Sequence, residues 1–154
     1  MELIWKTDLV IAQTVCLARS LRHWTGRELM PGVVVPGELA QAVFEAPFVL
    51  VSRGTELDPV LNYGNRAALM LWEMSWEELT RTPSRLTAEA PGREERARLP
   101  GTVTRRGFIE DYSGVRISKT GRRFRISRAL VWNLLTEEGR PCGQAAKFDC
   151  REFL

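Results

Sequence analysis

The chain has 154 residues, of which 44% are hydrophobic and 27% are charged, and its formal net charge is +3. A chain of this length and composition forms one globular domain that buries roughly two-thirds of its extended surface. No apolar run is long enough to cross a bilayer, and the start MELIWKTD lacks the basic and then apolar order of a signal peptide, so we expect a cytoplasmic protein without membrane association.

Histidine and cysteine limit the possible chemistry. The only histidine is His23, and the three cysteines, Cys16, Cys142 and Cys150, show no CxxC spacing. A zinc hydrolase, a Ser-His triad and a Cys-His dyad each lack part of their residue set, and no disulfide framework or structural zinc site is indicated. His23 lies at the end of a predicted helix, outside the motifs described below, so we do not expect a haem ligand. These limits argue against an enzyme.

The first predicted element is a helix from Asp8 to about Trp24, for which Thr7 is a suitable N-cap. Its role stays open. It can form a lid on the domain's own core, pack on the outer face of a sheet, or contact a second subunit through Leu17, Leu21 and Trp24.

Residues 30–37 contain two Pro-Gly pairs and predict a linker, since neither a helix nor a central strand tolerates such pairs. A short helix is predicted over Glu38–Glu45, and the apolar run Phe48–Ser52 predicts a central strand. The turn pair Asp58-Pro59 then leads into a short strand over Val60–Tyr63.

Two capped helices are predicted next. Asn65 is a good N-cap for a helix over Arg66–Glu73, because its side-chain oxygen can accept a hydrogen bond from a free amide of the first turn. Ser75 and Glu78 form a capping box for a second short helix. A strand, a tight turn and two small helices in so short a stretch typically frame a pocket.

The stretch between Pro91 and Gly107, GREERARLPGTVTRRG, begins as a charged helix that Pro100 interrupts. The last third of the chain predicts an antiparallel meander. Its strands are Ile109–Ser118, Arg122–Leu135 and Cys142–Asp149, joined by glycine-bearing turns.

A period-two pattern places six side chains of the longest strand on one face: Phe124, Ile126, Arg128, Leu130, Trp132 and Leu134. Arg128 is the charged member, and a buried guanidinium needs an acceptor. Three outcomes stay open: a core carboxylate such as Asp111 pairs with Arg128, a bulge turns it outward, or it meets an anionic ligand in a pocket.

Five arginines gather around the predicted hairpin: Arg116, Arg122, Arg123, Arg125 and Arg128. Guanidinium groups suit phosphates, but neither interleaved aromatic residues nor a recognition helix accompanies them. We therefore expect a solvated strand face and no nucleic acid partner.

Seven motifs follow one another over residues 46–148: APFVLVSRGTELDPVLNYGNRAAL, PSRLTAE, REERARL, DYSGVRIS, GRRFRI, VWNLL and GQAAKF. In this order they resemble the MEKHLA domain, a PAS-like domain found alone in bacteria and at the C-terminus of plant homeodomain-leucine-zipper transcription factors. The chain is similar to a standalone bacterial member. It departs from the family at Arg53, where relatives carry histidine, so a role of that histidine does not transfer.

The resemblance implies an α+β fold with a PAS-like five-stranded antiparallel sheet, short helices on one face and an N-terminal helix before it. Residues 1–37 would be the N-terminal helix and linker, and residues 38–154 the PAS-like domain. A shared fold supports many functions, so the fold alone implies little about chemistry.

The segment 82–86, TPSRL, is similar in spacing to a motif of the flavin-binding, light-sensing PAS branch, whose cysteine bonds to the excited flavin. Ser84 stands at the cysteine position, so no covalent flavin-cysteine adduct is expected. Asn133 and Gln144 lie on strands where that branch places amides against the flavin ring, so a flavin or another flat heterocycle stays a candidate cofactor. In the alternative, Ser84 caps a turn, Arg85 forms a surface ion pair and the amides bond to the backbone.

Eight residues are the candidate ligand-binding residues: Tyr63, Ser84, Arg85, Tyr112, Arg128, Trp132, Asn133 and Gln144. The arginines would neutralise an anion, the amides would bind polar edges and the rings would supply apolar contact. No metal site is expected.

We predict a sensory or regulatory module that binds a small molecule between the sheet and the helices and signals through protein contacts. Its partner would be a second copy or a regulatory protein. Two alternatives stay open: a ligand-free dimerisation or protein-interaction domain, and a small enzyme with carboxylates such as Glu110 or Asp111 as acid or base.

Overall fold

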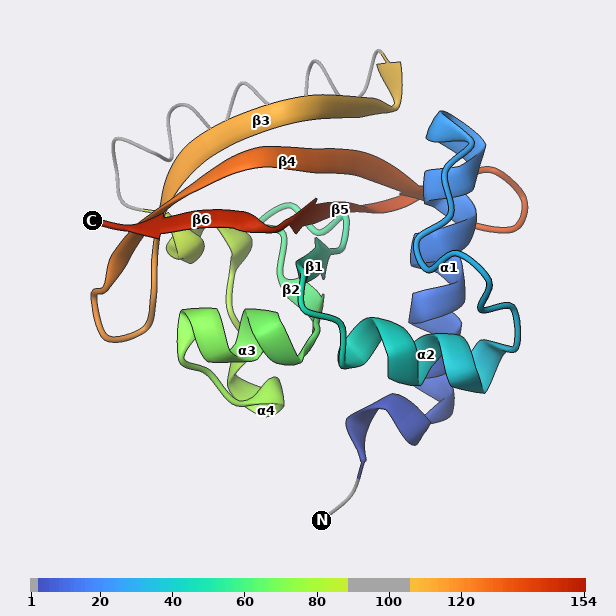
Figure 1. Cartoon of the computed structure of the whole chain (residues 1–154), viewed down its shortest axis with the longest axis horizontal. Helices are drawn as coiled ribbons and strands as arrows, with labels where there is room; N and C mark the ends of the chain where they lie inside the picture. Colours follow the sequence, from blue (N-terminus) through green and yellow to red (C-terminus); the bar gives the residue numbers. More distant parts are fainter. Residues whose placement is uncertain (1–2, 89–105) are drawn as a thin grey trace.

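The computed structural model describes residues 3–88 and 106–154 and contains a curved antiparallel sheet with helices packed against it (Figure 1). Its strands are β1 (Val49–Arg53), β2 (Leu61–Gly64), β3 (Phe108–Ile117), β4 (Arg123–Leu135) and β5 (Pro141–Phe148). They lie in the order β2-β1-β5-β4-β3, which places β1 inside the sheet and joins the last three as a meander. The predicted α+β class, central strand and meander are confirmed.

The sheet also contains β6 (Cys150–Phe153), which pairs with β4 from Phe124↔Phe153 to Ser127↔Cys150. The prediction that the strand ending at Asp149 closes the sheet is therefore wrong. The reason is that β5 pairs with β4 only between Leu130 and Leu135, which leaves the other half of β4 open to a further strand.

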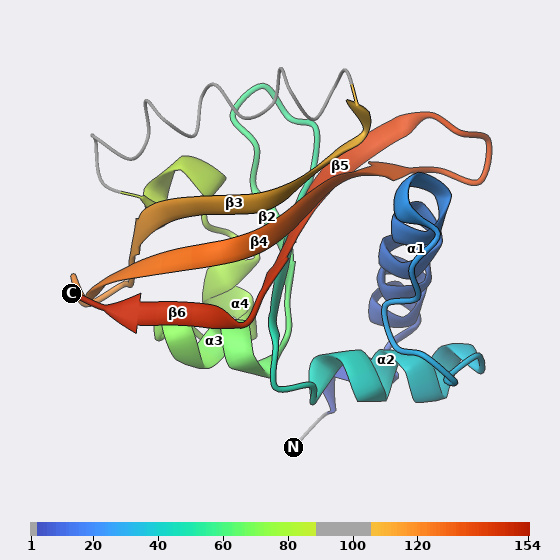
Figure 2. The ribbon, with the colours of Figure 1, turned by 45° about the horizontal axis from the view of Figure 1, so that its top comes forward.

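The helical segments lie on either side of β1 and β2 in both views (Figures 1 and 2). On one side are the 3-10 helix η1 (Ile4–Lys6), α1 (Asp8–Thr25) and α2 (Pro36–Phe44). On the other are α3 (Arg66–Trp72), α4 (Trp76–Leu79) and the 3-10 helix η2 (Ser84–Thr87). None of the helices in the described part of the chain has the length and apolarity to span a membrane.

The predicted caps are confirmed. Thr7 accepts a hydrogen bond from the Val10 N–H at the start of α1, and Ser75 and Glu78 form the reciprocal capping box of α4. The helix predicted from Glu38 begins earlier, at Pro36, because proline suits the first helical position, where its missing N–H has no helical partner. The predicted charged helix after Pro91 falls on residues 89–105, outside the described residues.

Two apolar cores lie on opposite faces of the sheet. Leu17 and Leu21 of α1 pack with Leu50, Tyr63 and Trp132 on one face. On the other face, the apolar side of α3 packs against β4 and the end of β5, through Ala68, Leu71, Trp72, Phe124, Ile126 and Phe148. Since Leu17 and Leu21 are buried in this chain's own core, they do not form the predicted contact surface for a second subunit.

A bulge in β4 changes which side chains face each core. Tyr112 pairs with Ala129 and Gly114 with Ile126, so β4 has one residue more than β3 over this span. Arg128 lies in the bulge with a φ of 55° and is exposed. The prediction that alternate residues of β4 share one face is therefore wrong beyond Ile126. Of the three outcomes considered for Arg128, the structure shows the one in which a bulge turns the side chain outward.

The thiols of Cys16 on α1 and Cys142 on β5 lie close together, with their Sγ atoms 3.8 Å apart. Burial, and then the neighbouring Cys16 thiol, raise the pKa of Cys142. Nearby, the Trp24 indole donates to the carbonyl of Asn133 at 2.9 Å. These contacts fix the C-terminal half of α1 against the sheet.

The side chain of Asn65 makes four hydrogen bonds while fully buried. Its oxygen accepts from the N–H groups of Leu50 (3.1 Å) and Ala68 (3.2 Å), and its amide donates to the carbonyls of Val43 (3.1 Å) and Phe48 (2.8 Å). One side chain thus joins the end of α2, the start of β1 and the first turn of α3.

Replacing Asn65 should destabilise the fold strongly. Asn65→Ala takes a hydrogen-bond partner away from four buried backbone groups and removes a helix cap, so we expect a loss of about 3 kcal/mol or more in urea unfolding. Asn62→Ala, at an exposed position on the preceding strand β2, should cost about 1 kcal/mol or less. Equal losses in the two variants would contradict the role given to Asn65.

Cys16 and Cys142 should form an intramolecular disulfide when a thiol oxidant such as diamide is added. Their Sγ atoms need to close from 3.8 Å to about 2.05 Å. Because the raised pKa keeps Cys142 protonated, the reaction should be faster at pH 9 than at about pH 7. Mass spectrometry would detect the loss of two hydrogens; Cys142→Ser should prevent it, and an intramolecular disulfide that persists in that variant would contradict the placement of α1.

Candidate functional site

An interior cavity of about 60 Å³ lies between the sheet and the α3–η2 side of the molecule. Its apolar wall includes side chains of α3, β4 and β5: Trp72, Ile126, Val131, Ala146 and Phe148. Its polar wall contains Ser84, Thr87, Tyr112, Arg116 and Gln144. An apolar hollow with a few polar groups is the usual form of a small-molecule site.

Larger hollows border α1 at the surface, and one of about 320 Å³ lies between α1 and residues 28–36. Two charged residues of its wall, Arg22 and Glu28, pair with each other at 2.8 Å. We therefore take the smaller, interior cavity as the candidate site. No cluster of metal-binding side chains occurs within residues 3–88 and 106–154.

Among the described residues of the cavity wall, Arg116 is the charged one, and only 5% of it is exposed. Its guanidinium donates to the Val115 carbonyl at 2.9 Å and to the Tyr112 hydroxyl at 3.0 Å. Gly114 leaves the space that the guanidinium occupies, because a Cβ there would lie 2.8 Å from Arg116 Nη1. In the part of the chain that the structure describes, no carboxylate forms an ion pair with Arg116.

Trp72 contributes a second buried donor. Its side chain is 3% exposed, and its indole N–H has no hydrogen-bond partner among the described residues. The ring contacts Phe124 and Phe148 edge to face, with centroids 5.3 Å and 6.2 Å apart. The wall therefore combines a rigid apolar surface with an unused N–H group.

A row of polar residues crosses the sheet beside the cavity. Arg53 on β1 pairs in register with Gln144 on β5, which pairs with Asn133 on β4. Paired residues share a face, and Gln144 lies in the cavity wall, so the row belongs to the cavity side. Burial lowers the pKa of Arg53, although Glu56 partly opposes this effect.

The structure brings together some of the residues predicted from the sequence. Ser84, Tyr112 and Gln144 line the cavity, and Asn133 lies beside Gln144. Ser84 is nearly buried, and its backbone N–H donates to the Pro59 carbonyl at 2.7 Å. Ser84, the serine of the segment 82–86, therefore lies at the cavity.

The other four predicted residues lie elsewhere. Tyr63 and Trp132 belong to the core under α1, where Trp132 donates to the Leu17 carbonyl at 3.2 Å and burial raises the pKa of Tyr63. Arg85 forms a surface ion pair with Asp58 at 3.2 Å, and Arg128 is exposed. Neither arginine lines the cavity.

Sequence reasoning missed Arg116, which it grouped with the surface arginines of the hairpin. The apolar neighbours Val115 and Ile117 suggest that they face inward, yet Gly114, Arg116 and Ser118 are the buried residues. The sequence did contain one indication that Arg116 is buried. Gly114, two residues earlier, lies on the same face of the strand and leaves room for the large side chain of Arg116.

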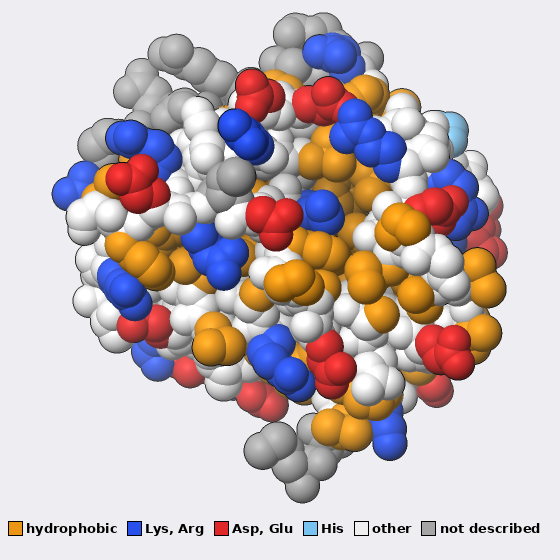
Figure 3. All heavy atoms as spheres, viewed as in Figure 1, with side chains coloured by type: hydrophobic (Ala, Val, Ile, Leu, Met, Phe, Trp, Pro, Cys, Tyr) orange, Lys and Arg blue, Asp and Glu red, His pale blue; other side chains and the backbone are white. Residues whose placement is uncertain are grey.

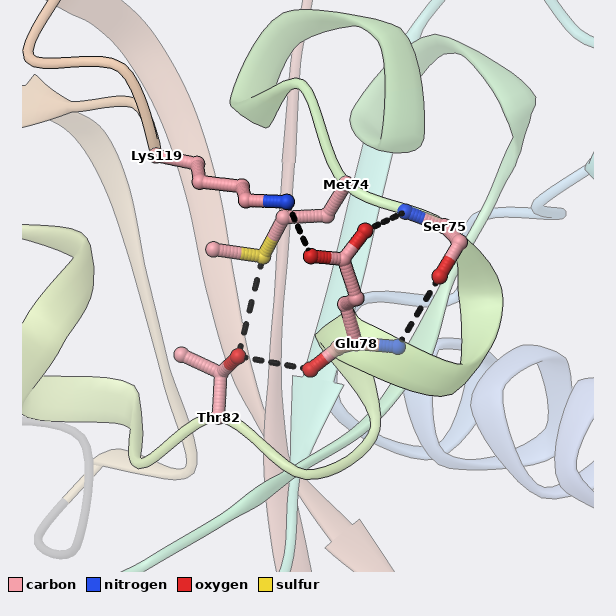
Figure 4. A network of polar contacts seen from close by, with 5 residues as sticks. All are labelled: Met74, Ser75, Glu78, Thr82 and Lys119. Carbon is pink, nitrogen blue, oxygen red and sulfur yellow. Dashed lines mark hydrogen bonds and ion pairs between the residues drawn. The ribbon is translucent and has the colours of Figure 1, made fainter.

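A polar network joins the β3–β4 turn to α4 (Figure 4). Lys119 in the β3–β4 turn pairs with Glu78 of α4, while its backbone N–H donates to the Trp72 carbonyl at 3.0 Å. Thr82 donates to the Glu78 carbonyl at 2.7 Å. Glu73 accepts from the hydroxyls of Ser118 and Thr120, so the hairpin is fixed to the α3–α4 corner.

Both glutamates of this network have lowered pKa values. The pKa of Glu73 is lowered first by the hydrogen bond from Ser118 and then by that from Thr120. The pKa of Glu78 is lowered first by the hydrogen bond from Lys119 and then by the backbone N–H of Ser75. Each carboxylate is thus stabilised in its charged form.

The carboxylates named as possible catalysts lie outside the cavity wall. Glu110 pairs with Arg27 at the surface, and Asp111 is exposed with a φ of 57°.

Figure 3 shows basic and acidic side chains mixed over one face of the molecule, without a large area of one sign.

The family model of the MEKHLA domain matches residues 11–153, and the fold is that of PAS domains. A PAS domain of a protein from Colwellia psychrerythraea superposes with a TM-score of 0.62 at 16% identity, covering 76% of this chain and 94% of that one. A light-oxygen-voltage domain studied with a flavin analogue superposes with a TM-score of 0.59 at 15% identity, covering 76% of this chain and 84% of that one.

A PAS domain from a two-component sensor histidine kinase gives a TM-score of 0.56 at 14% identity, covering 74% of this chain and 91% of that one. At these identities the likeness shows the fold alone, which confirms the predicted PAS-like architecture. A comparison with curated protein sequences found no match. The boundary at residue 37 stays a prediction.

The hairpin network should make the Tm of the chain fall as the pH is lowered into the acid range. The pKa values of Glu73 and Glu78 in the folded chain lie below the ordinary value of a glutamate. The two carboxylates therefore contribute their full stability to the fold at pH values above the ordinary pKa. This contribution is lost as the pH falls through the folded-state pKa values. In thermal unfolding, Glu73→Gln/Glu78→Gln should show a smaller fall in Tm between about pH 6 and pH 3 than the unmodified chain. Glu77→Gln, an exposed neighbour, should keep the original slope, and an unchanged slope in the double variant would refute the effect.

Proposed function

Since the chain belongs to the MEKHLA domain family, whose members are PAS-like, we propose that it is a sensory or regulatory module that binds a small molecule in the interior cavity. We propose further that occupancy of the cavity is passed to a protein partner or to a second copy of the chain. The observation that carries this proposal is the cavity itself, in which Ser84, Arg116 and Gln144 face the same small space.

The arrangement supports binding more than catalysis. Its groups come from three separated parts of the chain, η2, β3 and β5. The only histidine, His23, lies on α1, and the carboxylates considered as acid or base lie outside the cavity wall. The residues that line the cavity can recognise and orient a molecule, and we assign them no proton transfer.

A flavin does not fit the cavity. Its volume of about 60 Å³ is less than half of the roughly 150 Å³ that holds a single benzene ring in an engineered protein cavity. Ser84 also stands where the light-sensing branch would need a cysteine. We therefore propose a smaller ligand than a three-ring cofactor, one of a few heavy atoms.

Occupancy can reach the surface through the hairpin. Trp72 forms part of the wall, and its carbonyl accepts the backbone N–H of Lys119 in the β3–β4 turn. A ligand that shifts α3 would therefore shift this turn, which is exposed to a partner. This route supports signalling through protein contacts.

Filling the cavity should abolish binding without unfolding the chain. Ala146→Leu places a larger side chain in the cavity wall, whereas Ala12→Leu makes the same change at an exposed site on α1. A metabolite panel screened by thermal shift should give hits that raise the Tm of the parent chain and of Ala12→Leu, but not of Ala146→Leu. Native mass spectrometry of freshly purified protein would show a species that co-purifies.

Two results would refute the proposal. One is a chain that carries no co-purifying molecule and gains no stability from any panel compound. The other is a set of hits that stabilise Ala146→Leu as much as the parent, because such compounds would bind elsewhere.

A further inference from the structure

Arg116, Trp72 and Tyr112 each present a hydrogen-bond donor in the cavity wall. Arg116 is 95% buried, and the two groups that accept its hydrogen bonds, the Val115 carbonyl and the Tyr112 hydroxyl, carry no charge. A buried charge without a counter-charge is strongly unfavourable. Trp72 adds a buried indole N–H without a partner in the described part of the chain.

Tyr112 extends this set of donors. Its hydroxyl oxygen accepts a hydrogen bond from Arg116 Nη2, so its own hydrogen points away from the guanidinium and is available to an acceptor. Gln144, on the opposite strand wall, can also donate through its amide. A guest that accepts several hydrogen bonds and carries a negative charge would satisfy this wall, whereas a cationic guest would not.

The size and shape of the site favour one kind of anion. The planar fork of a guanidinium matches the two oxygens of a carboxylate. The space of about 60 Å³ holds a few heavy atoms, and it contains one buried cation beside apolar side chains such as Val131 and Phe148. A carboxylate with a short apolar tail uses both parts of the wall, whereas a dianion such as phosphate would leave charge uncompensated.

We propose that the cavity binds a small monocarboxylate, of the size of acetate or pyruvate, through an ion pair with Arg116. This inference rests on the proposed ligand-binding function and specifies its ligand class. The tail lies against Val131 and Phe148, and the donors of Tyr112 and Trp72 complete the coordination of the carboxylate.

The test uses the full chain and pairs of isosteric probes. Sodium acetate and acetamide have the same shape and differ in charge, and sodium chloride controls for ionic strength. Acetate at about 100 times its dissociation constant should raise the Tm by about 5 °C or more, whereas acetamide and chloride should not. Inorganic phosphate serves as the competing anion and should give no shift.

Two arginine variants identify the site. Arg116→Gln should weaken acetate binding by about 10- to 100-fold in calorimetric titration, because it removes a charge-assisted contact. Arg125→Gln removes the same charge from an exposed site on the neighbouring strand β4 and should bind acetate as the parent does. Without ligand, Arg116→Gln should keep or raise the Tm, since it removes an unpaired buried charge.

The outcomes separate the two proposals. If acetamide binds as well as acetate, or if Arg116→Gln retains full affinity, the carboxylate assignment is wrong while a small-molecule site remains. If phosphate shifts the Tm and acetate does not, the ligand class is wrong. If no compound binds in the cavity, both the assignment and the proposed function fail.

Discussion

The position of α3 over the sheet depends on the four hydrogen bonds of Asn65. Its side chain satisfies backbone groups at the end of α2, at the start of β1 and in the first turn of α3. Because those groups are buried, no water can replace the side chain. This one residue sets the distance between α3 and the sheet, and with it the space in front of Trp72.

Two strand irregularities decide which side chains enter that space. A residue with positive φ, Asp111, lies in β3, and another, Arg128, lies in β4. The bulge at Arg128 changes the face of the β4 residues that follow it, so that Val131 lines the cavity while Trp132 faces α1. The same shift turns Arg128 to solvent, whereas Arg116, on the regular part of β3, points inward.

This difference explains what the sequence could predict. The caps at Thr7, Asn65 and Ser75 depend on contacts within one helical turn, so residue types and spacing were sufficient. The faces of β3 and β4 depend on bulges that no residue type in those strands announces, because alternation assumes an unbroken strand. Of the eight candidate residues, Ser84, Tyr112 and Gln144 line the cavity and Arg128 is turned to solvent, whereas Arg116, which was not among them, lies in the wall. β6 was not predicted; it pairs with the half of β4 that β5 leaves open.

Three aromatic rings connect the interior to the end of the sheet. Trp72 in the cavity wall contacts Phe124 at 5.3 Å between centroids, and Phe124 contacts Phe153 of β6 at 6.2 Å. Phe153 is 47% exposed and lies under the Arg122 guanidinium. Closely packed rings have little room to absorb a displacement, so, if the cavity binds a ligand as proposed, a displacement of Trp72 would reach Phe153 through these contacts. Under the same proposal, the half-exposed ring of Phe153 on β6 would be a second surface, besides the β3–β4 turn, from which a partner detects occupancy of the cavity.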